Sequence, residues 1–251
     1  MEDLERVLVR LIGVDGVRSI LNVYLVGSRL FGTARRSSDY DLIIVCEGPA
    51  GGAQKHTAVR ERAAAGRAQR RWGACGGSRT LPRTLSCTYG VSKPTGLNPF
   101  SFSCSQGVDA WVIGAAAFQA AVDAHRMLEL MCLWLPPANV LRESRAFRVD
   151  LNLDVLRTAT LDTVTRDWAM AEKVVSKGEF RRGQKIAVHA LRLLLFATQV
   201  ATSGRVVTFD AARRWAWDEA AGTLTWPECA ALYGPELDAA KAALAEATGH
   251  R

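Results

Sequence analysis

The spacing of apolar residues near the start of the chain predicts one helix and two strands. A helical repeat precedes Gly13 and indicates a short helix that breaks at this glycine, because residues three and four apart share one helix face. Its apolar positions are Leu4, Val7, Leu8 and Leu11. Residues 22–26 and 39–45 are short apolar, β-branched runs, which predict two buried strands. The small and polar residues 27–38 predict a turn between them.

Further along, the pattern changes from strands to helices. Residues 108–113 predict a third strand, and residues 116–135 predict one long helix that two prolines end. Four more helices are expected at 161–177, 182–202, 209–220 and 235–248, and Gly178 and Gly204 are expected to end the first two. The fold class is therefore α/β (α+β), a core with a small mixed sheet followed by an all-helical C-terminal half. We expect one domain at 1–140 and a helical domain at 141–251.

Residues 47–107 interrupt the first domain, because Gly, Arg, Ser and Pro dominate there and only residues 57–69 could make a helix. Between residues 55 and 93 there are nine basic residues and one acidic residue, so this window carries +8 against +7 for the whole chain. Residues 91–106 read like a translated intron, with codons that fit a splice donor and a pyrimidine-rich acceptor. If they are one, the charge says nothing about partners. If the insertion is natural, a basic loop can hold RNA.

Composition excludes several classes of protein. The acidic, amphipathic start is unlike a secretory signal, and no apolar run reaches the roughly 18 residues of a membrane span. The six cysteines are scattered without a C-x-x-C pair, which favours thiols over disulfides or zinc. We expect an intracellular, cytoplasmic protein with no membrane partner. The organelle stays open.

Two carboxylates at the start of the second strand carry the candidate chemistry. Asp39 and Asp41 project from the same side because strand side chains alternate. They repel one another unless a cation such as Mg²⁺ or Mn²⁺ lies between them. Gly27 permits close backbone approach at the end of the preceding strand. Ser28 adds a hydroxyl and an amide, which at a helix start favour phosphate.

A third carboxylate is needed for a full metal site. Asp109 is the preferred ligand, because it faces the side of its strand opposite Ala110 and Val112. Asp150 and Asp154 are rivals, but they follow a helix and look more like a cap or a linker.

The run from Gly27-Ser28 to Asp39-Tyr40-Asp41 resembles the signature of the DNA polymerase β superfamily of nucleotidyltransferases. The resemblance implies two metals that bridge these carboxylates and an NTP, with the NTP bound at Gly27, Ser28 and Arg29. Asp109 is the candidate for the third carboxylate of that site. The resemblance also implies in-line attack of a hydroxyl on the α-phosphorus with loss of pyrophosphate.

A closer resemblance covers residues 22–45 and roughly 108–215. It is to predicted nucleotidyltransferases of the RNA-repair-associated DNA polymerase β family, which carry a late basic helix. The similar residues here are Lys185, His189 and Arg192, and Glu129 also looks similar to a glutamate of that group. This likeness ranks an RNA end first among acceptors. A small molecule such as an aminoglycoside and a protein side chain stay open.

Two alternatives stand beside this interpretation. Lys185, His189 and Arg192 form one stripe of a helix, either a solvated face or a site for an anion, since no acid occurs between Glu179 and Asp210. The whole chain is either an enzyme or a catalytically inactive nucleotide-binding or scaffold module of the same fold, unless the insertion prevents folding altogether. His125 and His250 are expected to be incidental.

Overall fold

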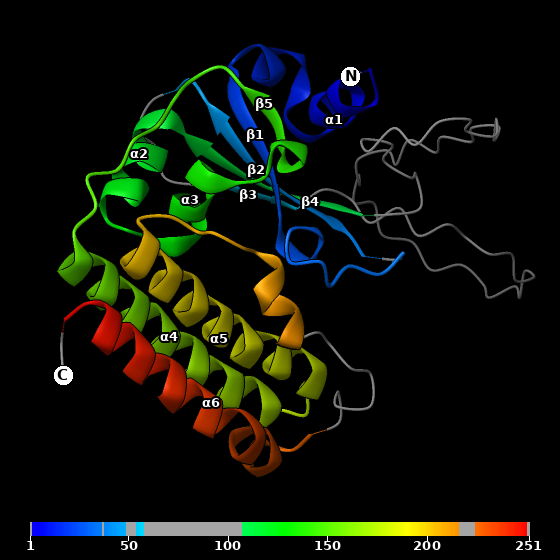
Figure 1. Cartoon of the computed structure of the whole chain (residues 1–251). Coiled ribbons are helices and arrows are strands. Elements are labelled where there is room, and N and C mark those ends of the chain that lie inside the picture. Colours follow the sequence, from blue (N-terminus) through cyan, green and yellow to red (C-terminus); the bar gives the residue numbers. More distant parts are fainter. Residues whose placement is uncertain (1, 37, 49–53, 58–106, 216–223, 250–251) are drawn as a thin grey trace, which may run out of the picture.

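The computed structural model describes residues 2–36, 38–48, 54–57, 107–215 and 224–249 (Figure 1). Helix α1 (Glu2–Arg18) is kinked at Gly13, whose φ of 76° and ψ of 168° are not helical, so the predicted break is confirmed. The chain does not leave the helix there, however, because it is helical again up to Arg18. Strands β1 (Ile20–Val26), β2 (Tyr40–Cys46) and β4 (Val108–Gly114) match the three predicted strands to within two residues.

These strands form part of a five-stranded mixed sheet in the order β3-β4-β2-β1-β5. Strand β1 is antiparallel to β2 and β5, β2 is parallel to β4, and β3 is antiparallel to β4. The edge strands β3 (Gln54–Thr57) and β5 (Val140–Glu143) were not predicted. Each has four residues, too few to show an alternating pattern. Strand β3 lies inside the expected insertion, of which residues 49–53 and 58–106 are outside the described ones. The residues of the intron hypothesis, 91–106, are among these.

Both faces of the sheet are buried, each by a different set of helices. On one face Val23, Ile44 and Ala110 pack against Leu8 of α1. On the other face Ile43 and Ile113 belong to a larger core, which α2 (Ala115–Asp123) and the helical half complete. Odd-numbered positions of β2 and β4 therefore face the helical half.

The prediction of a single long helix at residues 116–135 is wrong. The chain forms α2, then α3 (Met127–Leu130) and the 3₁₀ turn η2 (Met131–Trp134). His125 breaks the helix with a positive φ of 53°. Its buried ring bonds the Asp123 carbonyl through Nδ1 at 2.8 Å and accepts the Asn152 amide at Nε2 at 2.9 Å. His125 thus connects the end of α2 to Asn152, the N-cap of the later helix that starts at Leu153. A local sequence pattern does not reveal such a contact.

The helical half begins after the turn η3 (Pro137–Asn139) and β5. Helices α4 (Leu153–Val175), α5 (Phe180–Ser203) and α6 (Trp226–Ala247) lie side by side below the sheet (Figure 1). Gly204 ends α5 in the left-handed conformation, as predicted. The starts predicted for α4, at residue 161, and for α6, at residue 235, are both wrong. Helix α4 starts at Leu153 behind the N-cap Asn152. Helix α6 starts at Trp226 behind a Thr225/Glu228 capping box, and Pro235 lies inside it.

The region predicted as a helix at 209–220 is instead a short 3₁₀ element, η4 (Asp210–Trp215), and residues 216–223 lie outside the described ones. The predicted fold class is confirmed: a small mixed sheet precedes a helical C-terminal half. Helix α5 is the only described helix long and apolar enough to pass for a membrane span. Half of that apolar window is buried in the fold, as expected of a core helix.

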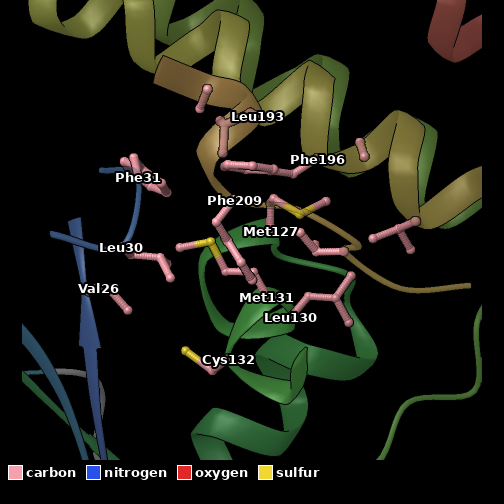
Figure 2. Close-up of a cluster of buried hydrophobic side chains, with 14 of the residues drawn as sticks. Val26, Leu30, Phe31, Met127, Leu130, Met131, Cys132, Leu193, Phe196 and Phe209 are labelled. Carbon is pink, nitrogen blue, oxygen red and sulfur yellow. The ribbon is translucent and has the colours of Figure 1, made fainter. Parts of the chain in front are cut away.

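One apolar cluster fixes the loop after β1 against the helical half (Figure 2). Leu30 and Phe31 point into the space between α3 and α5. The rings of Phe31 and Phe196 stack with centroids 5.5 Å apart, and Phe209 meets Phe196 at the same distance. The loop that follows Gly27 is therefore held under α5, which brings two distant parts of the chain to one place.

The cysteines among the described residues agree with the expectation of free thiols. Cys132 and Cys229 are buried, and Cys46 is half-buried. Cys75, Cys87 and Cys104 fall outside the described residues, as does His250.

Candidate functional site

Three carboxylates occur at the start of two neighbouring parallel strands. Asp41 and Asp109 are each the second residue of their strand, and they are direct partners in the β2–β4 register. Asp39 precedes β2 by one residue. In strands the side chains of every second residue share a face. Asp41 and Asp109 thus share the sheet face of Ile43, which is the face toward the helical half.

Gly27 closes tightly on Asp41 from the neighbouring strand end. A Cβ placed on Gly27 would lie 1.9 Å from Oδ2 and 2.6 Å from Cγ of Asp41. The φ of Gly27 is also positive, at 70°. Space and backbone conformation each require glycine here, and the turn is thereby pressed against the carboxylate.

The surroundings of Asp41 disfavour its charge. Burial and the nearby charges of Asp109 and Asp39 raise the pKa of Asp41 from 3.8 to about 6. A backbone hydrogen bond from Ser28 and the positive charge of Lys185 act in the opposite direction, but more weakly. The three carboxylates therefore form one electrostatic unit with excess negative charge, and Ser28 and Lys185 lie within its reach.

The other two carboxylates differ in their surroundings. Asp39 accepts a hydrogen bond from the Gly107 amide at 3.1 Å, and a Cβ on Gly107 would lie 2.7 Å from the same oxygen. Asp109 is exposed. Gly107 thus anchors Asp39 beside the start of β4, and this contact was not foreseen from the sequence.

The donor set suits a hard divalent cation, since Mg²⁺ takes carboxylate oxygens together with phosphates and water. The like charges at Asp41 are also those a cation would offset. As the side chains stand, however, the described residues hold no group of three or more acidic, His or Cys side chains close enough to ligate one ion. The electrostatic coupling acts over longer distances than ligation, so the two observations are compatible. Direct ligation requires side-chain rotation.

The turn after β1 is a three-residue 3₁₀ element, η1 (Gly27–Arg29), rather than the start of an α-helix. The helix-dipole contribution expected at Ser28 is therefore small. Arg29 donates to the Ser38 carbonyl at 2.8 Å, and its guanidinium lies 3.7 Å from the centroid of the Tyr40 ring. Arg29 thus joins the two ends of the 27–40 loop.

The basic stripe of α5 divides into three environments. Lys185 is exposed, and its charge reaches Asp41. His189 pairs with Asp167 of α4 at 2.8 Å, so the acid missing nearby in the sequence is supplied by the fold. Arg192 donates to the Trp215 carbonyl at 3.2 Å and lies over the Phe31 ring at 4.9 Å, and burial lowers its pKa to about 10. Of the three, Lys185 is the one whose charge acts on the carboxylate cluster.

Other candidates lie elsewhere. Glu129 is buried in α3 with its pKa raised by burial, and its nearest basic partner is Arg126 at 3.9 Å. Asp154 occupies the first turn of α4 and donates its amide to the cap Asn152, as expected of a cap region, and Asp150 lies in the linker before it.

Sequence reasoning missed a basic residue that lies against the loop after β1. A Cβ on Gly32 would lie 3.1 Å from Cδ of Arg213, so the side chain of this η4 residue contacts the loop. No local pattern marks Arg213, because only the return of the chain over α5 brings it there.

Two hollows on the described surface lie apart from the carboxylates. One of about 450 Å³ is lined by η2 and by the segment after α5, including Trp134, Pro136 and Val207. The other lies along α4 between Asp154 and Asp162. Neither has a wall residue in common with the carboxylate site, so the chemistry, and not the size of a hollow, identifies the candidate site.

No protein-family model matches the chain, and no curated protein matches it. Among solved structures, a nucleotidyltransferase-like protein from Exiguobacterium sibiricum is similar to it at 11% identity, over 98% of this chain and 74% of that one, with a TM-score of 0.30. So slight a likeness carries no argument about the site. The α+β fold class is carried by the mixed sheet and the helical half themselves.

Proposed function

We propose that this chain is a metal-dependent nucleotidyltransferase that moves a nucleoside monophosphate from an NTP to a hydroxyl acceptor. The observation that supports it best is the partnership of Asp41 and Asp109 on one sheet face, with Asp39 coupled to them and Gly27 pressed against Asp41. A protein does not gain stability from such a cluster of like charges. A divalent cation would offset the repulsion between the carboxylates and could bind a polyphosphate at the same time.

The reaction is a displacement at phosphorus. The acceptor oxygen forms a bond to the α-phosphorus. The bond between that phosphorus and the oxygen bridging the α- and β-phosphates breaks, and pyrophosphate leaves with the electron pair. The hydroxyl proton passes to Asp109. A divalent cation held by Asp39, Asp41 and Asp109 would neutralise developing charge on the phosphate oxygens.

The protein's own part is to position and to hold charge. The turn at Gly27 and Ser28 lies beside Asp41, and the Ser28 amide, which now donates to that carboxylate, would donate to a phosphate oxygen once a cation holds Asp41. Lys185 brings a positive charge from α5 to the same place. Arg192 and His189 are proposed as further nucleotide contacts after local rearrangement, since both are engaged within the fold as it stands.

Transfer from an α-phosphate-labelled NTP with Mg²⁺ or Mn²⁺ tests the proposal. We expect label in the acceptor and one pyrophosphate released per transfer. Asp39→Ala/Asp41→Ala should abolish both, while Asp150→Ala, an exposed linker change, should not. The label distinguishes this reaction from hydrolysis or γ-phosphate transfer, either of which would contradict the proposal.

The second candidate is a nucleotide-binding or scaffold module of the same fold without catalysis. It is favoured by the Asp39–Gly107 hydrogen bond and by the absence, among the described residues, of a ready ligand set for a metal. If the wild type binds nucleotide with the same metals but transfers no label, the module is the correct candidate. Loss of both binding and turnover would reject both candidates.

A further inference from the structure

Trp111 is an exposed aromatic residue next to the carboxylates. It lies on β4 two residues after Asp109, so the two side chains share one sheet face. Two residues of a strand span roughly 6.6 Å, which puts the indole beside the candidate site. Trp111 keeps 36% of its surface exposed, on the face that buries Ile113 one repeat further.

The Trp111 ring lies outside the hydrophobic clusters of the described residues. It belongs to neither of the two that cover the sheet. Its parallel partner Ile43 is buried, whereas Trp111 is not. Among the described residues no aromatic ring stacks on it, although five other aromatic pairs are present there. A single exposed ring is common on protein surfaces, so its meaning here comes from its place beside the carboxylates, where its open face can stack on a ligand.

The position of Trp111 indicates which substrate it meets, an inference that rests on the proposed function. The sheet order places β1 and its Gly27–Ser28 turn on one side of β2, and β4 on the other. In a displacement at phosphorus, the attacking and leaving oxygens lie roughly in line, on opposite sides. If pyrophosphate leaves toward the turn, the acceptor approaches from the side of Asp109 and Trp111.

The charges nearby indicate the class of acceptor. The carboxylates lie nearest to Trp111, and the divalent cation of the proposed function would offset their charge. The remaining charges are positive, because Lys185 acts on Asp41 from α5 and Arg181 is exposed one turn earlier on that helix. A cationic acceptor such as an aminoglycoside would be repelled by these groups, whereas a phosphodiester would be attracted. An aromatic ring stacks on any nucleobase. We infer that Trp111 is a stacking platform for the terminal base of a single-stranded nucleic-acid acceptor.

Binding of a fluorescein-labelled ten-nucleotide single strand, RNA or DNA, to the full chain tests this without catalysis. Fluorescence anisotropy at fixed salt would compare Trp111→Leu, which removes the ring, with Trp111→Phe, which keeps a smaller one. Leu232→Ala is the matched control, because Leu232 is an exposed apolar residue of α6. Unfolding midpoints check that each variant is folded.

We expect Trp111→Leu to weaken strand binding about tenfold, and Trp111→Phe by a few-fold at most. Leu232→Ala should match the wild type, and NTP binding should be equal in all four proteins. Unchanged strand binding in Trp111→Leu, or no strand binding by the wild type, would overturn the inference. So would a loss confined to the NTP, or a Trp111-dependent affinity for kanamycin in place of the strand.

The outcome is separable from that of the proposed function. Trp111-dependent strand binding without nucleotide transfer would keep the platform and reject the enzyme. Transfer to a small hydroxyl acceptor that Trp111→Leu leaves unchanged, together with absent strand binding, would keep the enzyme and reject the platform.

Discussion

A Cβ on Gly27 would lie 1.9 Å from the carboxylate oxygen Oδ2 of Asp41, although the two residues are on different strands. The contact joins the end of β1 to the start of β2. Position 27 therefore cannot carry a side chain while Asp41 keeps its position. Variants of Gly27 and Asp41 test this contact, a variant of Lys185 tests the charge beside it, and a variant of His125 tests a distant tie within the fold.

Gly27→Ala should abolish nucleotide transfer and destabilise the protein. The methyl group displaces Asp41, and the positive φ adds strain of about 1 kcal/mol. Gly178→Ala is the matched control, since Gly178 has φ 80° and nothing within 4 Å of a Cβ. It should cost similar backbone strain and leave transfer intact. Chemical denaturation and the transfer assay measure the two effects, and equal activity in both variants would refute the steric argument.

Asp41→Asn should stabilise the metal-free protein at neutral pH while removing activity. The pKa of Asp41 is raised from 3.8 to about 6 in the fold, so the folded state binds this proton more tightly than the unfolded chain. That contribution is fully present below pH 4 and is lost as the pH rises through 6. At pH 7 the charged carboxylate therefore lowers stability, by about 1–2 kcal/mol after allowance for its partial exposure.

Thermal unfolding in EDTA at pH 4 and pH 7 checks this expectation. The difference between wild type and Asp41→Asn should be small at pH 4 and should favour the variant at pH 7. Added Mg²⁺ should raise the midpoint of the wild type only. If the wild type is more stable than Asp41→Asn at pH 7 in EDTA, the charged carboxylate does not destabilise the fold.

Lys185→Met should weaken the binding of NTP more than it slows transfer. Lys185 reaches Asp41 from α5, and its charge lowers the pKa of that carboxyl. Loss of one charged contact to phosphate raises KM by about tenfold. Arg182→Gln is the control on the same helix, because Arg182 pairs with Glu179 at 3.0 Å. A KM that is unchanged in Lys185→Met and raised in Arg182→Gln would move the phosphate contact away from Lys185.

His125→Ala should destabilise the protein by about 2–3 kcal/mol, since it removes a buried ring and leaves the Asn152 amide without its acceptor. His189→Ala removes a half-exposed pair with Asp167 and should cost less than about 1 kcal/mol. Urea denaturation of the two variants gives the comparison. Equal losses would mean that His125 does not tie α2 to the start of α4.

Part of the site was accessible from the sequence because its signals are local. Alternation put Asp109 on the face opposite Ala110, and the clusters of the fold agree. Gly27 could be marked as a position of close approach, but not as a contact of Asp41. The partner of His189 could not be found at all, since Asp167 is 22 residues away on another helix.

The sequence by itself determined the three inner strands, the kink at Gly13 and the glycine that ends α5, because periodicity and glycine conformation act over a few residues. Only the tertiary structure decided the break at His125, the edge strands and the approach of Lys185 to Asp41. Those features depend on contacts between residues far apart in the chain, and such contacts form only when the sheet and the helices pack together.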